Sequence, residues 1–315
     1  MSGGPDLSVV VVTHSGFDVV RKAVGHLSTQ RARDRIELLV VAPDCEHLGS
    51  VGHSLDGFWG HRIVEAGQIT TTGRAIEVGF RAASAPLVGY VEEHSYPQPG
   101  WAEAVIDAHR GPWAAVGVSI GNANPGSAIS WAMLFLDFSP SVELAEPGEV
   151  RALPSHHTVY KRDALTGHRE PLHRLLEVEA VLQSALLARG DRLYQESAAR
   201  QLHVNVSRLR SMVTAQFYGG LQYAPLRVRE EGFSLARRLA YGAAGPLIAL
   251  VQLRRILGHV RRAGLTRELI PRMMPALLIG LVAEQLGETV GYLSRSQGRA
   301  PEKRLTIELD RASHI

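Results

Sequence analysis

The 315-residue chain has one cysteine, Cys45, so it can form no intrachain disulfide, and its composition fits a reducing compartment. We expect Cys45 to serve as a small apolar side chain in the core. Residues 1–7 lack the basic segment and long apolar stretch of a secretory signal. The most apolar window, residues 273–283, is shorter than a membrane-spanning helix requires. These absences predict a cytoplasmic protein.

Two further absences concern nucleotides and nucleic acids. No G-x-G-x-x-G follows the first apolar run, residues 8–12, where a dinucleotide-binding enzyme carries it. The arginine-rich C-terminal part has no interleaved aromatic residues and no recognisable nucleic-acid-binding module. The sequence therefore argues against a Rossmann-type oxidoreductase and against a nucleic-acid partner.

Charge is distributed unevenly along the chain. The net charge is +3, but residues 227–272 contain ten arginines and three glutamates. We therefore predict two domains, an α/β domain over residues 1–226 and a basic helical region over residues 227–315. The basic region could face anionic lipid or an acidic partner, and a plain solvated helix face is the alternative.

Apolar runs alternate with helical patterns in the first 95 residues. The predicted strands and helices are strands 8–12, 36–41, 63–64 and 87–91, with helices 17–30 and 73–85 between them. This alternation predicts an α/β fold with a mainly parallel sheet flanked by helices and joined by right-handed crossovers.

The middle of the chain is less regular. Later predicted elements are helix 101–109, strand 113–120, a short strand from 156 that runs into a helix start near 162, one amphipathic helix 172–189 closed by Gly190, and a strand beginning at 192. Residues 121–154 carry clusters of Gly, Asn, Pro and Ser. A long irregular segment in a compact domain is often functional, so we expect part of a substrate cleft or a lid there.

One strand ends on side chains that can bind metal. The run 87–91 stops at Glu92, Glu93 and His94, and a Pro-rich turn follows. Carboxylate and imidazole suit Mn²⁺, Mg²⁺ or Zn²⁺, and ligands gather at the carboxyl ends of strands in open α/β sheets. The alternative is a solvated acidic turn.

The order of these motifs resembles the family 2 glycosyltransferases of the GT-A fold, over about residues 7–226. Residues 8–14 look like that family's first strand and base-cupping turn, with Thr13 in the turn. Residues 88–101 look like its Asp-x-Asp motif and Pro-Gly-Trp helix start. Residues 157–165, beginning at His157, are similar to its Asn-x-x-Tyr-Arg-Arg segment.

Two more positions extend the resemblance. Glu179 lies where the family's Glu-Asp-x-Asp-Leu motif would lie, and His203 matches a histidine after the next strand in several members. There are departures as well. Glu-Glu-His replaces Asp-x-Asp, and the paired aspartates after the second strand are replaced by Ala42 and Pro43, with Asp44 next. The selectivity for the nucleotide base is therefore not carried over.

The resemblance implies a metal-dependent, inverting hexosyltransferase that moves a sugar from a nucleotide-diphosphate donor to an acceptor hydroxyl. In this hypothesis His94, Glu92 and His203 bind Mn²⁺ or Mg²⁺, and Glu179 is the catalytic base. The residues expected to contact the donor are Thr13, Asp44, Arg74, Glu92, Glu93 and His157. For Glu179 the alternative is an exposed helical carboxylate, and for His157 and His203 it is a structural histidine.

The function has an alternative of another class. The changed acidic motif also fits a non-catalytic sugar-nucleotide-binding or scaffold protein that kept the fold. For the enzyme, the sequence leaves the acceptor unidentified. A lipid-linked acceptor would suit a basic C-terminal region that contacts the inner face of the membrane peripherally.

Overall fold

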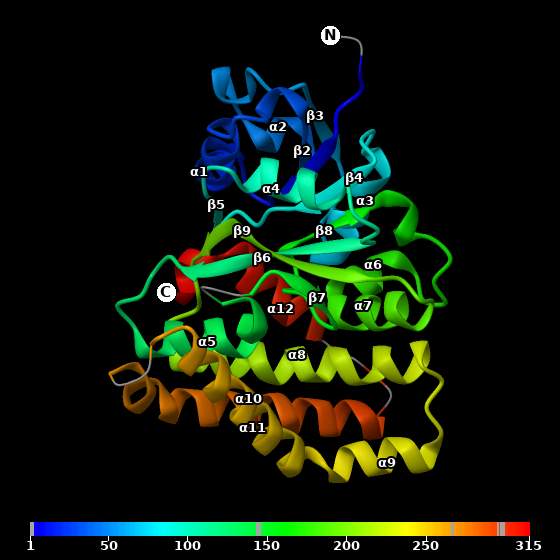
Figure 1. Cartoon of the computed structure of the whole chain (residues 1–315), viewed down its shortest axis with the longest axis vertical. Coiled ribbons are helices and arrows are strands. Elements are labelled where there is room, and N and C mark those ends of the chain that lie inside the picture. The colour runs from blue at the N-terminus through cyan, green and yellow to red at the C-terminus, as the bar shows by residue number, and fades with distance from the viewer. Residues whose placement is uncertain (1–2, 143–145, 266–267, 295, 297–299) are drawn as a thin grey trace. The chain divides into compact units, whose positions relative to one another are not determined.

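The computed structural model describes residues 3–142, 146–265, 268–294, 296 and 300–315 (Figure 1). The chain divides into two compact units, Met1–Gly121 with Ala145–His203, and Asn122–Leu144 with Val204–Ile315. The domain boundary predicted after residue 226 falls inside a single helix of the second unit, α8 (Leu209–Glu230).

A parallel set of strands forms one half of the sheet in the first unit. Its order is β3 (Gly60–Glu65), β2 (Ile36–Ala42), β1 (Leu7–Val12) and β4 (Leu87–Tyr90), all parallel. Strands β1, β2 and β4 are buried at every position, and they are apolar except for Ser8 and Glu37, whose side chains hydrogen-bond to each other. Helices α1 (Phe17–Ser28) and α3 (Thr72–Ala82) connect strands of this set. The predicted α/β class, with helices flanking the sheet and a helical C-terminal region, is confirmed.

The other strands extend this sheet beyond β4. Their order is β8 (Thr158–Lys161), β6 (Ala115–Asn122), β9 (Leu193–His203) and β5 (Ser95–Pro97), and β7 (Gly148–Val150) pairs with β9. The neighbouring pairs β4–β8, β8–β6, β9–β5 and β9–β7 are antiparallel. The pairing of β5 with β9 places Ser95 opposite His203. That register brings the residues after β4 next to the end of β9, more than 100 positions later in the chain.

Three local predictions are wrong. The segment 121–154 contains a regular helix, α5 (Ala128–Phe138), whose N-cap Ser127 accepts hydrogen bonds from the Ile129 and Ser130 backbone N–H groups. The cluster of small and polar residues before it is a helix cap and not a long loop. The segment 172–189 is two helices, α6 (Leu172–Glu177) and α7 (Glu179–Ala188), because Val178 leaves helical geometry with φ −140° and ψ 72°.

The third wrong prediction concerns Cys45, which was expected in the core. The side chain is exposed, because Cys45 begins a short surface helix, α2 (Cys45–Leu48), and is not part of the core. The remaining elements of the first unit are α4 (Trp101–Ala108) and short 3₁₀ turns at Arg33–Arg35, Gly52–Leu55 and Arg162–Leu165.

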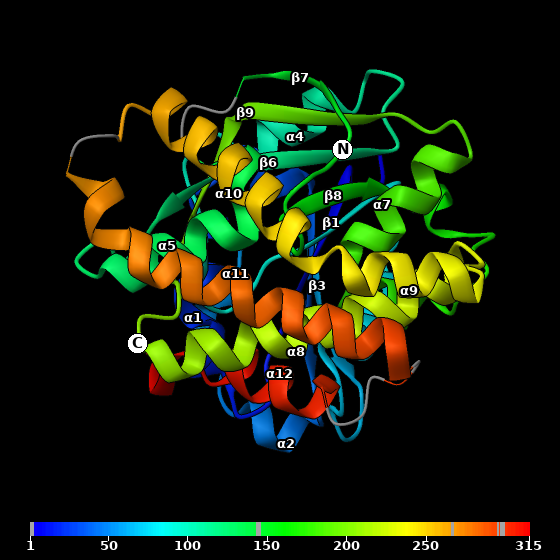
Figure 2. The same cartoon turned by 90° about the horizontal axis from the view of Figure 1, so that it is seen from below.

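The second unit is helical. Besides α5 and α8 it contains the 3₁₀ turn Ser139–Ser141, α9 (Leu235–Ala243), α10 (Gly245–Arg262), α11 (Leu269–Ser294), α12 (Ala300–Leu309) and the 3₁₀ turn Arg311–His314. Helix α11 packs along α8, and α9 and α10 lie beside α11 (Figure 2). Gly287 allows the closest approach, because a Cβ atom there would collide with the Phe217 carbonyl oxygen of α8.

Helix α11 extends well beyond the eleven-residue apolar window seen in the sequence. Among the described residues, it is the one helix long and apolar enough to cross a membrane, with mean hydropathy 1.4 over its most apolar window, and 39% of that window is buried inside the protein. A core helix of a soluble protein meets the same criterion, so length and composition alone do not assign it to a membrane.

Candidate metal and donor site

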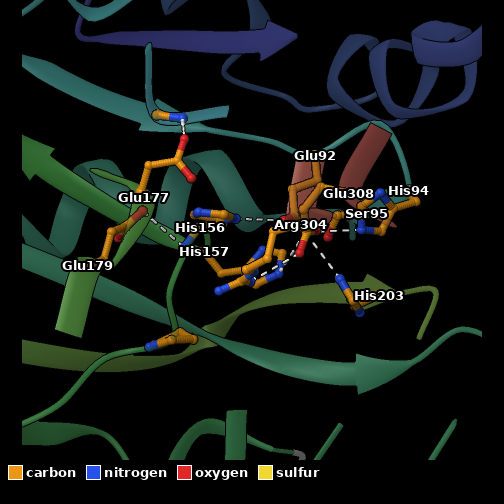
Figure 3. A network of polar contacts seen from close by, with 12 residues as sticks. Glu92, His94, Ser95, His156, His157, Glu177, Glu179, His203, Arg304 and Glu308 are labelled. Atoms are coloured by element: carbon orange, nitrogen blue, oxygen red, sulfur yellow. Dashed lines mark hydrogen bonds and ion pairs between the residues drawn. The ribbon is translucent and has the colours of Figure 1, made fainter. Parts of the chain in front are cut away.

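Four histidines surround the carboxylate of Glu92 in the first unit (Figure 3). Oε1 of Glu92 lies 2.9 Å from Nδ1 of His156. Oε2 lies 3.1 Å from Nε2 of His203, 3.3 Å from Nε2 of His157 and 3.4 Å from Nε2 of His94. All five side chains are buried, with at most 7% of any residue exposed. The predicted solvated turn is therefore excluded for Glu92 and His94.

Three different parts of the chain build this cluster. Glu92 and His94 follow the carboxyl end of β4, His203 is the last residue of β9, and His156 and His157 directly precede β8. Since β8 pairs with β4 and β9 pairs with β5, the sheet register brings these ends together. The rings of His94 and His203 pack edge to face with centroids 4.8 Å apart. We call Glu92, His94, His156, His157 and His203 the Glu92 cluster.

The electrostatics of the Glu92 cluster favour an ionised carboxylate. Burial by itself would raise the pKa of Glu92, but the charge of His94 and hydrogen bonds from His156 and His157 outweigh burial and lower this pKa well below its usual value. Burial lowers the pKa of His157, which the hydrogen bond to Glu92 only partly offsets. Metal binding requires an ionised carboxylate and neutral imidazoles, so an ion bound at this cluster would displace the proton of His94.

Three members of the cluster could hold a metal ion. One ligand atom from each of Glu92, His94 and His203 lies within 4.8 Å of the other two. A carboxylate and two imidazoles form a donor set known from sites for divalent first-row metals, and such sites keep further coordination positions for water or substrate oxygens. The geometry thus brings together the three residues that the sequence predicted as metal ligands.

Glu179 lies next to this cluster and has two hydrogen-bond partners. Oε1 accepts a hydrogen bond of 3.0 Å from the backbone N–H of His156, and Oε2 accepts one of 2.5 Å from the hydroxyl of Tyr160. Burial raises the pKa of Glu179, although the charge of His156 and the Tyr160 hydroxyl oppose the increase. Glu179 is 2% exposed, so it is not an exposed helical carboxylate.

His156 links Glu179 to Glu92 through an unusual backbone conformation. Its φ is 62°, in the left-handed region that residues other than glycine seldom adopt. The Glu179 carboxylate holds the backbone N–H of His156, and Glu92 holds its ring. Strain of this kind persists only where surrounding contacts determine the conformation, and it is common at functional sites.

The other predicted donor contacts lie near the carboxyl ends of parallel strands. Thr13 follows β1, and its buried hydroxyl donates to the Gly16 carbonyl at 2.8 Å within the turn before α1. Asp44 follows β2 and is partly buried, and Glu93 is buried beside Glu92. Arg74 lies in the first turn of α3 with its side chain exposed. Their strands run parallel, so Thr13, Asp44 and Glu92 belong to one edge of the sheet.

The sequence did not predict roles for His156, Tyr160 or Glu177. His156 adjoins His157, but its positive φ and its contact with Glu92 depend on the pairing of β8 with β4. Glu177 accepts a hydrogen bond of 2.5 Å from the backbone N–H of Gly73 at the start of α3. Its carboxylate therefore caps the N-terminus of a helix that lies 104 positions earlier in the sequence.

Comparisons with known proteins reach only the level of the fold. No protein-family model and no curated protein matches the chain. S. aureus TarS matches with a TM-score of 0.46 and 16% identity over 90% of this chain, which spans 55% of the TarS chain. TarS 1–349 in complex with UDP matches with a TM-score of 0.44 and 16% identity over 92% of each chain. A mycobacterial protein matches with a TM-score of 0.48 and 16% identity over 71% of this chain and 75% of its own.

Proposed function

We propose that the protein is a metal-dependent, inverting glycosyltransferase that moves a hexose from a nucleotide-diphosphate donor to an acceptor hydroxyl. One observation carries the proposal: Glu92, His94 and His203 offer ligand atoms within 4.8 Å of one another at the end of β4. The order of sequence motifs resembles family 2 glycosyltransferases, and in that resemblance Glu92, Glu93 and His94 stand in place of the Asp-x-Asp motif.

The donor set fits a divalent ion. The low pKa of Glu92 keeps its carboxylate ionised, and an ion bound to His94 would displace the ring proton whose charge lowers that pKa in the metal-free protein. Two nitrogen ligands suit Mn²⁺ better than Mg²⁺, which prefers oxygen. When bound, such an ion would offset the negative charge of a departing nucleoside diphosphate.

The chain's own residues would do the remaining work. Thr13 and Asp44 lie at the sheet edge where a nucleoside would bind, and Arg74 can supply positive charge near the phosphates. Glu179 would accept the proton of the acceptor hydroxyl. Its raised pKa brings it closer to the working pH, which favours general base catalysis.

Ligand binding tests the metal and donor together. A thermal-shift panel of nucleotide sugars, with and without Mn²⁺ or Mg²⁺, should find one nucleotide that stabilises the protein only when metal is present. A ligand at about 100 times its Kd adds roughly 2.7 kcal/mol to the unfolding free energy. His94→Ala and His203→Ala should each abolish the metal effect, while His53→Ala, an exposed histidine outside the cluster, should keep it. Unchanged metal affinity in both cluster variants would exclude the site.

Turnover tests the base. Glu179→Gln should lower the rate of sugar transfer by at least about 100-fold, as expected for loss of a positioned general base. Binding of the nucleotide, measured by calorimetry, should stay within about twofold, because Glu179 does not belong to the proposed metal ligands. Transfer at the wild-type rate would remove Glu179 from the mechanism.

A non-catalytic role is the second candidate. It is favoured by the contacts of Glu179, whose two carboxylate oxygens already accept hydrogen bonds from Tyr160 and His156. In that case the chain would bind a sugar nucleotide or scaffold other proteins without turnover. Stabilisation by a nucleotide sugar with no transfer or hydrolysis, across a panel of acceptors, would support this reading over the enzyme.

A further inference from the structure

We propose that the exposed face of α9, α10 and α11 binds the surface of an anionic lipid bilayer, with the helices lying in the plane of the interface. This inference concerns the second unit alone and does not depend on the proposed chemistry of the first. We call this face the α9–α11 surface.

Large apolar side chains are concentrated on the α9–α11 surface. Of the sixteen exposed large hydrophobic residues in the described part of the chain, eleven belong to these three helices. They are Leu235 and Leu239 on α9, Leu247, Leu250 and Val251 on α10, and Leu278, Ile279, Val282, Leu286, Val290 and Leu293 on α11. A concentration of exposed large apolar side chains on neighbouring helices favours an interaction site.

The exposed apolar residues of α11 form one stripe along the helix. Ile279, Val282, Leu286, Val290 and Leu293 recur at spacings of three and four, so they share a face. The opposite face packs on α8 through glycines such as Gly287. Seen from below, α11 runs between α10 and α8, and α9 lies beside one end of α11 (Figure 2). The residues of the stripe are all exposed.

Unmatched positive charge accompanies the apolar face. Helix α10 carries Arg254, Arg255, Arg261 and Arg262, all exposed, and its sequence contains no acidic residue. None of these four arginines forms an ion pair with an acidic side chain among the residues that the structure describes. By contrast, Glu231 neutralises Arg227 and Arg237 nearby.

The combination of exposed apolar side chains and arginines favours an anionic lipid bilayer as the partner of the α9–α11 surface. Exposed Leu and Val beside arginines suit a bilayer interface, where acyl chains take up apolar side chains and anionic headgroups meet guanidinium groups. On α10 the two kinds of residue occupy successive turns of one helix, with Leu247, Leu250 and Val251 followed by the four arginines.

The packing of α11 favours an orientation along the membrane and not across it. A spanning α11 would carry α8 into the hydrocarbon region, because α8 covers one whole face of it. Helix α8 contains Arg210, Gln216, Gln222 and Arg227, which are costly in hydrocarbon. With α11 in the interface plane, its stripe enters the bilayer surface while α8 remains on the protein side.

Vesicle flotation with the full chain tests the proposal. The chain should float with phosphatidylcholine vesicles containing about 30% phosphatidylglycerol and far less with pure phosphatidylcholine, because each arginine near an anionic surface adds attraction. Replacing all four α10 arginines with glutamine should weaken partitioning of the chain onto anionic vesicles by about 100-fold. Val282→Asp with Leu286→Asp should weaken it by at least about tenfold. A matched control, Arg31→Gln with Arg151→Gln, exchanges exposed arginines of the first unit and should float like wild type.

A second measurement uses only the wild-type chain, so its result does not depend on whether the variants fold. Anionic vesicles should slow amide hydrogen exchange in α9, α10 and α11 of the wild-type chain while exchange in α1 stays unchanged. Wild-type chain that stays unbound by anionic vesicles would overturn the proposal. So would a dimer in light scattering that Val282→Asp with Leu286→Asp converts to monomer without any vesicle binding, since a second copy would then cover this face.

Discussion

Buried glutamates occur in both units, but their surroundings differ. Glu92 in the first unit is enclosed by four imidazoles, and its pKa is lowered well below the usual value despite burial. In α11 of the second unit, burial raises the pKa of Glu284 to about 8 and that of Glu288 to about 7. Repulsion from Glu288 adds to the shift of Glu284, while Gln285 and Arg227 moderate that of Glu288.

The contrast shows that burial alone does not determine the state of a carboxylate. Both environments oppose charge, but only the Glu92 cluster supplies enough nearby cationic and hydrogen-bonding partners to reverse that effect. An ionised buried carboxylate can bind a metal ion, whereas a carboxyl group that is protonated near neutral pH serves as a hydrogen-bonding group between helices. The predictions below test this difference, from the largest expected effect to the smallest.

Replacing Glu92 should have the largest effect. Glu92→Gln removes the charge around which four imidazoles are arranged, so the unfolding free energy at pH 7 should fall by about 4 kcal/mol. Affinity for Mn²⁺ should fall by at least about 100-fold, because a metal ligand is lost. Urea unfolding and calorimetry measure the two effects. Glu46→Gln, at an exposed position of α2, should change neither. Wild-type stability in Glu92→Gln would mean that the four imidazoles do not depend on the carboxylate.

Gly287→Ala tests the close packing of α11 against α8. The new Cβ atom would meet the Phe217 carbonyl oxygen, so α8 and α11 must separate and the unfolding free energy should fall by about 3 kcal/mol. The matched control is Gly258→Ala on α10, where no atom lies within 4 Å of the added carbon. That change should stabilise the protein by about 1 kcal/mol, the usual helix preference of Ala over Gly. Equal effects of both substitutions would contradict the close approach.

The pH dependence of stability should reveal Glu284. Its folded pKa of about 8 exceeds the usual 4.5, so between these values the folded state keeps a proton that the unfolded state releases. The unfolding free energy should therefore fall as pH rises from about 5 to about 8. Glu284→Gln should flatten this decline by about 2 kcal/mol over that range. Urea midpoints at several pH values measure the slope, and an unchanged slope would show that Glu284 ionises without cost.

The smallest effect is expected at Tyr160. Tyr160→Phe removes the hydroxyl that donates to Glu179, so the unfolding free energy should fall by about 1 kcal/mol. Because this hydrogen bond lowers the pKa of Glu179, its loss should raise that pKa further. Carboxyl titration by NMR follows the change. Thr29→Ala, which removes an exposed hydroxyl on the surface, should leave the titration of Glu179 unchanged. A lower pKa in Tyr160→Phe would contradict the contact.

Much of the first unit could be predicted from local sequence. The runs 8–12 and 36–41 correspond to β1 and β2 within a residue at each end, because a strand buried on both faces is rich in apolar residues. Helix α5 was missed because its N-terminal Ser, Gly and Pro residues have the composition of a loop. The break at Val178 was missed because the helical spacing of apolar residues continues across it.

The candidate site was predictable in its residue types and not in its contacts. Glu92 and His94 stood out at the end of a strand, and His203 through resemblance to a family motif. Their proximity depends on the pairing of β5 with β9, which joins residues more than 100 positions apart. The positive φ of His156 and the hydrogen bond from Tyr160 to Glu179 depend on the same folding of distant segments.

The sequence by itself determined the α/β class, the strand that ends just before Glu92 and the excess of arginine in the helical region, because each follows from periodicity or composition within a short window. Only the tertiary structure decided which histidines meet Glu92, which glutamates are buried in α11 and which apolar residues of α9, α10 and α11 remain exposed. Solvation and pKa depend on neighbours in space, and distant segments become neighbours only when the sheet and the helical layer form.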